Sequence, residues 1–234
     1  MSRSRSGRSG IAPRPIRTRT LGWLLVAAAC GAGRRQEVAT TPQPVAARPT
    51  EDYVAKARAD SIRHPYTKAD IDFMSGMIAH HTQALQMARW APTHRASPEL
   101  LRLSERIINA QGDEIALMQN WLRDRLQPVP EARPTGMRMM MNGVEHDMLM
   151  PGMLTPEQMQ QLDQARGPEF DRLFLTFMIQ HHRGAVTMVK DLFDSYGAGV
   201  DDLVFKFASD VNIDQTTEIA RMEKMLVALI TTPH

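Results

Sequence analysis

Two pairs of adjacent histidines, 101 positions apart, lie in matching surroundings. One methionine precedes each pair by three residues and another follows it by six. Imidazole nitrogen and thioether sulfur are both metal ligands, and the soft thioether favours copper, Cu(I) above all, over hard cations. The repeated unit therefore predicts a copper site, with iron and zinc less favoured. The candidate ligands are Met77, His80, His81 and Met87, and their counterparts Met178, His181, His182 and Met188.

A second repeated motif follows each histidine pair. The stretch QGDEIALMQNWL (111–122) aligns with QTTEIARMEKML (215–226), and each copy places Gln, Glu and Met on one helical stripe. The carboxylates are expected either to bind the metal or to accept hydrogen bonds from the imidazoles. The methionines are either further ligands or core residues. These candidates are Glu114, Met118, Glu218 and Met222.

Helical spacing leaves open which histidine of each pair faces the metal. Residues four apart share one helix face, so the spacing to Met77 favours His81. The spacing to Met87 favours His80 instead. Both alternatives need the histidine-bearing helices to pack with these faces toward the interior of a bundle.

Other interpretations of the histidines compete with metal binding. Isolated histidines on helices are usually structural or exposed, and His64, His94 and His234 are assigned to this group. Burying four imidazoles without partners would cost several kcal/mol, which favours a metal over simple packing. A di-iron centre is disfavoured because the helical segments contain no Glu-x-x-His motif. The remaining alternatives are a metal-dependent oxidase of cuprous or ferrous ions and a structural or partner-binding bundle without metal.

The helix start and stop signals predict an all-α fold. Two copies of one helical hairpin, over about 67–127 and 168–231, would form a four-helix bundle with a long crossover. No strand is expected, because alternation of β-branched residues is absent. The expected helices run from about Thr67 to Trp90, from Pro98 to before Pro128, from about Pro168 to Tyr196 and from about Asp201 to Ile230, with a short extra helix at 155–165.

The crossover contains the segment 135–159, which holds eight of the 17 methionines. A connection of this length inside a compact domain is usually functional, or wraps over the surface. The segment is therefore either a flap that captures Cu(I), with His146 as one ligand, or a flexible apolar cover.

The N-terminal sequence predicts export. Six arginines precede a nine-residue apolar run that ends at Cys30, so residues 1–29 are expected to be a signal peptide. Residues 30–50 form a Pro- and Ala-rich tether, and 51–234 form the metal-binding domain. Cys30 is either lipidated, making the protein a lipoprotein, or left as a free thiol after ordinary cleavage. Lipidation is favoured because a lone thiol is reactive in an oxidising compartment.

Removal of the signal peptide changes the charge balance. The full chain has a formal charge of +2, but 22 basic residues remain against 26 acidic ones, so the mature chain carries about −4. No clustered basic face is left for a nucleic acid, which is excluded as a partner. The expected partners are metal ions, copper-handling proteins of the cell envelope and, through the lipid anchor, the membrane.

Three stretches carry a resemblance to a known family. They are DFMSGMIAHHTQALQMA (72–88), MPGMLTPEQMQQL (150–162) and FDRLFLTFMIQHHRGAVTMV (170–189). They closely resemble the bacterial domain-of-unknown-function family 305, over about 69–229. The resemblance implies a ferritin-like four-helix bundle outside the cytoplasm that binds copper through Met and His in copper tolerance. The ligands that it implies are Met77, His80, His81, Met87, Met178, His181, His182 and Met188.

The sequence thus predicts an exported copper-binding protein that buffers or delivers copper at the cell envelope or in the periplasm. No nucleophile and base arrangement and no phosphate-binding glycine loop is visible, so the protein is not expected to be an enzyme.

Overall fold

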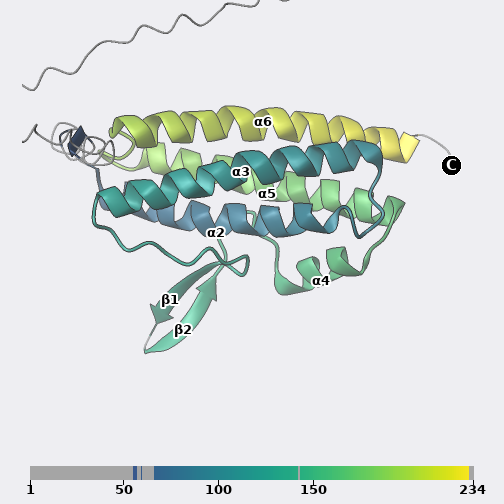
Figure 1. Ribbon diagram of the computed structural model, residues 1–234, viewed down its shortest axis with the longest axis horizontal. Coiled ribbons are helices and arrows are strands. Elements are labelled where there is room, and N and C mark those ends of the chain that lie inside the picture. Colours follow the sequence, from purple (N-terminus) through teal and green to yellow (C-terminus); the bar gives the residue numbers. More distant parts are fainter. Residues whose placement is uncertain (1–54, 57–58, 60–65, 142, 232–234) are drawn as a thin grey trace, which may run out of the picture. The chain divides into compact units, whose positions relative to one another are not determined.

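The computed structural model describes residues 55–56, 59, 66–141 and 143–231. Four long helices lie side by side in it, and a hairpin and a short helix connect the second of them to the third (Figure 1). The predicted four-helix bundle with a short extra helix is confirmed. The elements are α2 (Lys68–Trp90), α3 (Pro98–Asp124), β1 (Met137–Met141), β2 (Val144–Met148), α4 (Pro156–Gln164), α5 (Pro168–Asp194) and α6 (Asp202–Thr231).

Several predicted features lie outside the described residues. They are the signal peptide (1–29), the tether (30–50) with Cys30, and the histidines His64 and His234. These features stay predictions. None of the helices in the described part of the chain has both the length and the hydrophobicity needed to cross a membrane.

Three of the helices, α2, α3 and α4, begin where capping side chains satisfy free N–H groups. Thr67 caps α2: its hydroxyl accepts from the Asp70 N–H, and the Asp70 carboxylate accepts from the Thr67 N–H at 2.6 Å. Thr155 and Gln158 make the same reciprocal capping box at α4. Such a cap stabilises a helix by about 1 kcal/mol. The predicted helix starts are therefore confirmed, with Ser97 capping α3 as well.

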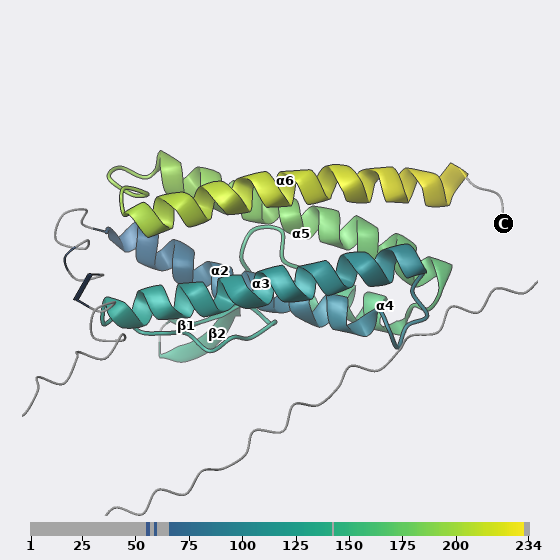
Figure 2. The same cartoon turned by 45° about the horizontal axis from the view of Figure 1, so that its top comes forward.

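The helices pair as the internal repeat predicts. α2 packs along α3, α5 packs along α6, and the two hairpins meet where α2 contacts α5 (Figure 2). The turn from α5 to α6 uses Gly197 and Gly199 at φ values of 74° and 67°. The Gly199 N–H donates to the Asp70 carboxylate at 2.7 Å, which joins this turn to the start of α2. One half of the repeat is thereby fastened to the other.

The apolar interior is divided into two clusters at opposite ends of the bundle. The first core cluster packs the C-terminal halves of α3 and α5 against the N-terminal half of α6. The second core cluster packs the N-terminal halves of α3 and α5 against Met222 of α6. The histidine pairs belong to neither cluster, although all four are fully buried. A polar layer therefore separates the two apolar cores.

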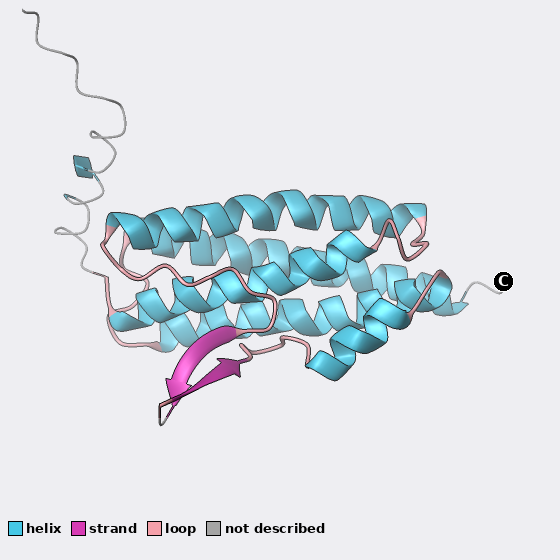
Figure 3. Cartoon of the chain, turned by 60° about the horizontal axis from the view of Figure 1, so that its bottom comes forward, coloured by secondary structure: helices cyan, strands magenta, loops and turns pink. Residues whose placement is uncertain are grey.

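The crossover contains a β-hairpin, so the expectation of no strand is wrong. β1 pairs with β2 as antiparallel strands, and Gly143 between them has a φ of 80° (Figure 3). The sequence contains a signal for it, because the dipeptide Asn142-Gly143 favours a tight hairpin turn. The signal was outweighed because the strand MRMMM lacks the β-branched residues typical of strands.

After the hairpin, residues 149–154 form a strap across α2 and α5. Gln83 on α2 holds its C-terminal end: the Gln83 amide donates to the Leu154 carbonyl at 3.1 Å, and its carbonyl accepts from the Leu154 N–H at 2.7 Å. The same amide donates to the Pro134 carbonyl, before the β-hairpin, at 2.9 Å. The strap meets α5 where two glycines face each other. A Cβ on Gly184 would lie 1.9 Å from the Pro151 carbonyl oxygen, so only glycine permits this approach.

Replacing Gly184 by alanine should therefore destabilise the protein. We expect a loss of about 1–3 kcal/mol, the usual range for overpacking a tight contact, measured as a lower urea midpoint of unfolding. Gly112→Ala in α3 is the matched control, because nothing lies within 4 Å of its added Cβ. That variant should gain about 0.5–1 kcal/mol from helix propensity. Equal midpoints for the two variants would contradict the assigned role of Gly184.

Candidate metal centre

Four imidazoles meet in the middle of the bundle. His80 of α2 and His181 of α5 are closest, with ring centroids 3.8 Å apart. His81 lies 6.1 Å from its neighbour His80, and His182 lies 6.3 Å from His181. The structure thus brings both predicted histidine pairs together at the point where the two halves of the repeat touch.

Oxygen atoms surround the Nε2 side of these rings. His80 Nε2 lies 3.1 Å from the Pro151 carbonyl of the strap, and His181 Nε2 lies 3.1 Å from the His80 carbonyl. His182 Nε2 lies 2.9 Å from the carboxylate of Glu218 on α6. Since carbonyl and carboxylate oxygens can only accept, each of these three Nε2 atoms carries the proton and donates.

His81 has a different contact with its carboxylate. Its Nε2 is 2.8 Å from Glu114 Oε2, yet the angles of this contact are not those of a hydrogen bond. The contact has the distance of an ion pair without the angles of a hydrogen bond, so it does not fix which ring nitrogen of His81 carries the proton.

The Nδ1 atoms of all four histidines are buried without a hydrogen-bond partner among the described residues. With the proton on Nε2, Nδ1 carries a free lone pair. Metal-binding histidines generally have this arrangement, in which one ring nitrogen donates to a carbonyl or carboxylate and the other binds the metal. The buried, unpartnered nitrogens therefore fit a metal ion, and Nδ1 is the atom that would bind it.

The environment favours the neutral form of His80, His181 and His182. Burial lowers the pKa of His80 and of His181 well below the usual value of 6.5, and neighbouring histidines lower both further. Burial also lowers the pKa of His182, although Glu218 opposes the shift. Neutral imidazole is the form that binds metals, so no proton has to be removed near neutral pH.

The polar layer extends toward solvent between α3 and α6. Gln111 and Gln215 are buried in it, and the Gln111 amide makes no hydrogen bond within the described residues. A groove of about 350 Å³ is lined by these glutamines together with Glu114 and Glu218. Both carboxylates that contact histidines therefore also face an open groove, and the layer is accessible from this side.

The predicted methionine ligands lie on both sides of the layer rather than within it. Each core cluster holds three of these six methionines, in the arrangement that the pseudo-symmetry of the repeat predicts. All six are buried. A methionine three residues before one histidine pair thus shares a cluster with the methionine that follows the other pair. The first core cluster holds Met77, Met118 and Met188, and the second holds Met87, Met178 and Met222.

Sequence reasoning missed several contributors to this site. The Pro151 carbonyl contacts His80, and Gln83 and Gly184 hold the strap that carries it. No set of three or more His, Cys, Asp and Glu side chains in the described ranges is arranged to hold a metal ion as it stands. Thioether sulfur or a rotation of the rings is therefore needed to complete a site. His94, assigned a structural role, is buried apart from the layer and contacts the Asp163 carboxylate at 3.1 Å.

The fold and the site together define a class of protein. It is a helical bundle made of two repeated helical hairpins, with paired histidines buried where the hairpins meet. The chain belongs to the family described as Domain of unknown function (DUF305), whose model matches residues 70–226. The resemblance seen in the sequence is confirmed. No curated protein matches the chain at a significant level.

Solved structures of similar proteins agree with the fold. A DUF305 protein from Streptomyces coelicolor, named as a candidate secreted protein, is 26% identical, with 71% of this chain and 96% of that chain covered and a TM-score of 0.57. CopM in its Cu(II)-bound form is 29% identical, with 68% and 96% covered and a TM-score of 0.51. CopM in its Cu(I)-bound form is 28% identical, with 67% of this chain and 94% of that chain covered and a TM-score of 0.50.

The lowered pKa values predict that the metal-free protein loses stability in acid. The unfolded chain takes up protons on these histidines near pH 6.5 and the folded chain does not, so stability should fall as the pH drops below about 6.5. Each such histidine contributes up to about 1.4 kcal/mol per pH unit. Urea midpoints at pH 7.5 and 5.5 measure the effect, and the variant His80→Gln, His181→Gln should lose most of it. A wild-type midpoint that does not change with pH would contradict this account.

Proposed function

We propose that this protein binds copper in the polar layer and buffers or delivers it, without catalysing a reaction. The observation that carries the proposal is the set of four buried imidazoles with unpartnered Nδ1 atoms. The CopM structures, solved in Cu(II)-bound and Cu(I)-bound forms, support the choice of metal. The ligand types support it independently, because imidazole and thioether together suit copper better than they suit hard cations.

Three kinds of side chain would hold the ion or orient its ligands. His80, His81, His181 and His182 would supply nitrogen, and the six methionines of the two core clusters would supply thioether sulfur. Glu114 and Glu218 would orient the outer imidazoles from the groove side. Copper held there can take either oxidation state, since imidazole accepts both and thioether favours Cu(I). The bundle interior buries all four imidazoles, and the groove between α3 and α6 would give the ion a route to them.

Removing the imidazoles should abolish tight copper binding in the polar layer. We expect the variant with all four histidines changed to glutamine to bind Cu(I) and Cu(II) in the layer at least about 100-fold more weakly, because it lacks the nitrogen ligands. Anaerobic Cu(I) and aerobic Cu(II) titrations against a competing chelator measure the loss. An unchanged affinity and stoichiometry would defeat the site assignment.

Two further variants make this experiment decisive. His94→Gln is the matched control, since this histidine is also buried and contacts a carboxylate, yet it lies apart from the layer. Its copper affinity should equal that of the wild type. Glu218→Gln keeps an acceptor for His182 and removes only the charge, so it should fold and weaken binding by about 10- to 100-fold. This milder variant keeps the assignment testable if the fourfold variant does not fold.

We also propose that the protein is exported and held at the membrane through Cys30. The apolar run after six arginines supports export, and the similar Streptomyces coelicolor protein is named as a candidate secreted protein. A negatively charged mature domain on a tether of about twenty residues would then reach copper outside the cytoplasm. The same placement explains the use of methionine sulfur, because cysteine thiols oxidise there.

Labelling with an alkyne analogue of palmitate tests the anchor. The full chain, expressed in a bacterial host, should carry the label and partition with membranes. Cys30→Ser should lose the label because the only thiol in the chain is removed. Gln36→Ser in the tether should keep it. An unlabelled wild-type protein in the soluble envelope fraction would show ordinary cleavage instead of lipidation.

A further inference from the structure

The β-hairpin has two chemically different faces. Residues directly opposite each other in an antiparallel pair project from the same face, and every second residue of a strand shares that face. The register places Met139 opposite His146 and Met137 opposite Met148. Among the side chains that the structure describes, one face therefore carries three thioethers, one imidazole and Val144. We call Met137, Met139, His146 and Met148 the hairpin face.

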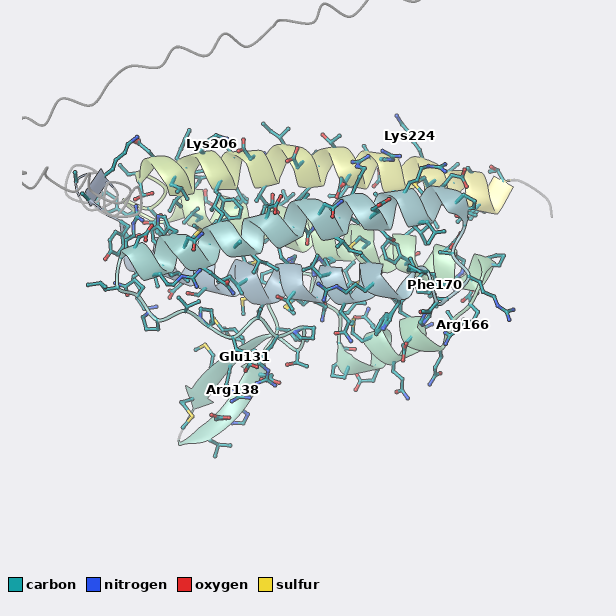
Figure 4. The ribbon with its side chains drawn as sticks, in the orientation of Figure 1. Glu131, Arg138, Arg166, Phe170, Lys206 and Lys224 are labelled. Carbon is teal, nitrogen blue, oxygen red and sulfur yellow. The ribbon has the colours of Figure 1, made fainter. Side chains whose placement is uncertain are left out.

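The opposite face of the hairpin is charged. Arg138 pairs with Glu145 at 3.3 Å, and Arg133 reaches Asp147 at 3.4 Å. These ion pairs gather the charged side chains on one side of the two strands, where Arg138 is labelled in Figure 4. The hairpin face itself holds no carboxylate, lysine or arginine among its described side chains, so its possible ligands are thioether sulfur and imidazole nitrogen.

The β2 side of the hairpin face is open to solvent, whereas its β1 side is partly sheltered. Met148 is 42% exposed and His146 is exposed, whereas Met139 is half-buried. At the base, Met137 packs against the first core cluster, and β1 lies next to α2. Apolar packing accounts for Met137 but leaves the exposed thioether of Met148 and the imidazole of His146 unexplained.

The spacing of these side chains suits one metal ion. Directly opposed residues have Cβ atoms about 4.5–5.5 Å apart, and diagonal neighbours lie about 7–8 Å apart. A methionine side chain is long and flexible enough for its sulfur to cover the remaining distance. Two thioethers and an imidazole from two strands can therefore bind one ion, and soft sulfur selects Cu(I) or another soft monovalent cation.

We propose that the hairpin face is a second, separate metal site that binds one Cu(I) or Ag(I) ion through Met139, His146 and Met148. Met137 supports it from the core. The strap, residues 149–154, serves instead as the buried cover, with Met150 and Met153 packed in the first core cluster. The methionine-rich crossover thus divides into an exposed binding part and a buried packing part. The site depends on no residue of the histidine layer.

Metal titration of combined variants tests the proposal. In the background with His80, His81, His181 and His182 changed to glutamine, we expect one equivalent of Cu(I) to remain bound under anaerobic conditions. Adding Met139→Leu, His146→Gln and Met148→Leu should remove that equivalent, because leucine keeps the volume and loses the sulfur. Met140→Leu is the matched control: this methionine is 64% exposed and belongs to the other face, so the equivalent should remain.

A second measurement uses the unmodified layer and keeps the test independent of the fourfold variant. In wild-type protein with ¹³C-labelled methionine methyl groups, Ag(I) added beyond the amount that the layer binds should shift the signals of Met139 and Met148 and leave that of Met140 in place. Loss of all Cu(I) binding in the layer variant, or equal effects at Met140, would overturn the hairpin site while leaving the proposed layer site intact. If the variant with all four layer histidines replaced kept every equivalent of Cu(I), the proposed layer site would be overturned and the hairpin site would stand.

Discussion

The burial of four imidazoles between two apolar clusters is the constraint on which the rest of the structure depends. Imidazole nitrogen loses hydration when it is buried, and each unpaired polar atom costs about 1–3 kcal/mol. The bundle reduces this cost by giving every Nε2 an oxygen neighbour, from the strap, from the α2 backbone or from a glutamate. It leaves all four Nδ1 atoms without a partner. A fold stabilised by packing alone would gain nothing from such a layer, whereas a metal ion recovers the lost interactions.

The same constraint explains the long crossover between the two halves of the repeat. His80 lies where no side chain of the opposite helical hairpin supplies an acceptor, and a backbone carbonyl from the crossover fills that position. The carbonyl of Pro151 can approach only because Gly184 has no side chain, and Gln83 fixes the strap from the other side. The crossover is therefore part of the site, since it sets the protonation of one of its central rings.

Much of this architecture could be predicted from the sequence because its signals are local. Thr67, Ser97 and Thr155 mark helix starts through their own hydrogen bonds, and the repeat alone indicates two equivalent helical hairpins. The Pro151 contact could not be predicted, because a carbonyl 71 positions from His80 leaves no trace in residue type. The hairpin was missed for a different reason. Its Asn-Gly turn signal was present, but methionine has no marked strand preference and the pairing of Met139 with His146 appears only in the register.

The duplication that built the site also left its halves unequal. Arg106 holds one oxygen of Glu218 at 3.1 Å while the other accepts from His182, so this carboxylate is fixed from two sides. The repeat places Asp210 where Arg106 would have its counterpart, so Glu114 has no matching arginine at that position. Its contact with His81 is short but lacks hydrogen-bond geometry. The second half therefore has a preorganised imidazole, and the first half has one that is free to adjust. An ion that arrives from the groove would meet a rigid ligand on one side and an adaptable one on the other, which suits the proposed binding and release of copper.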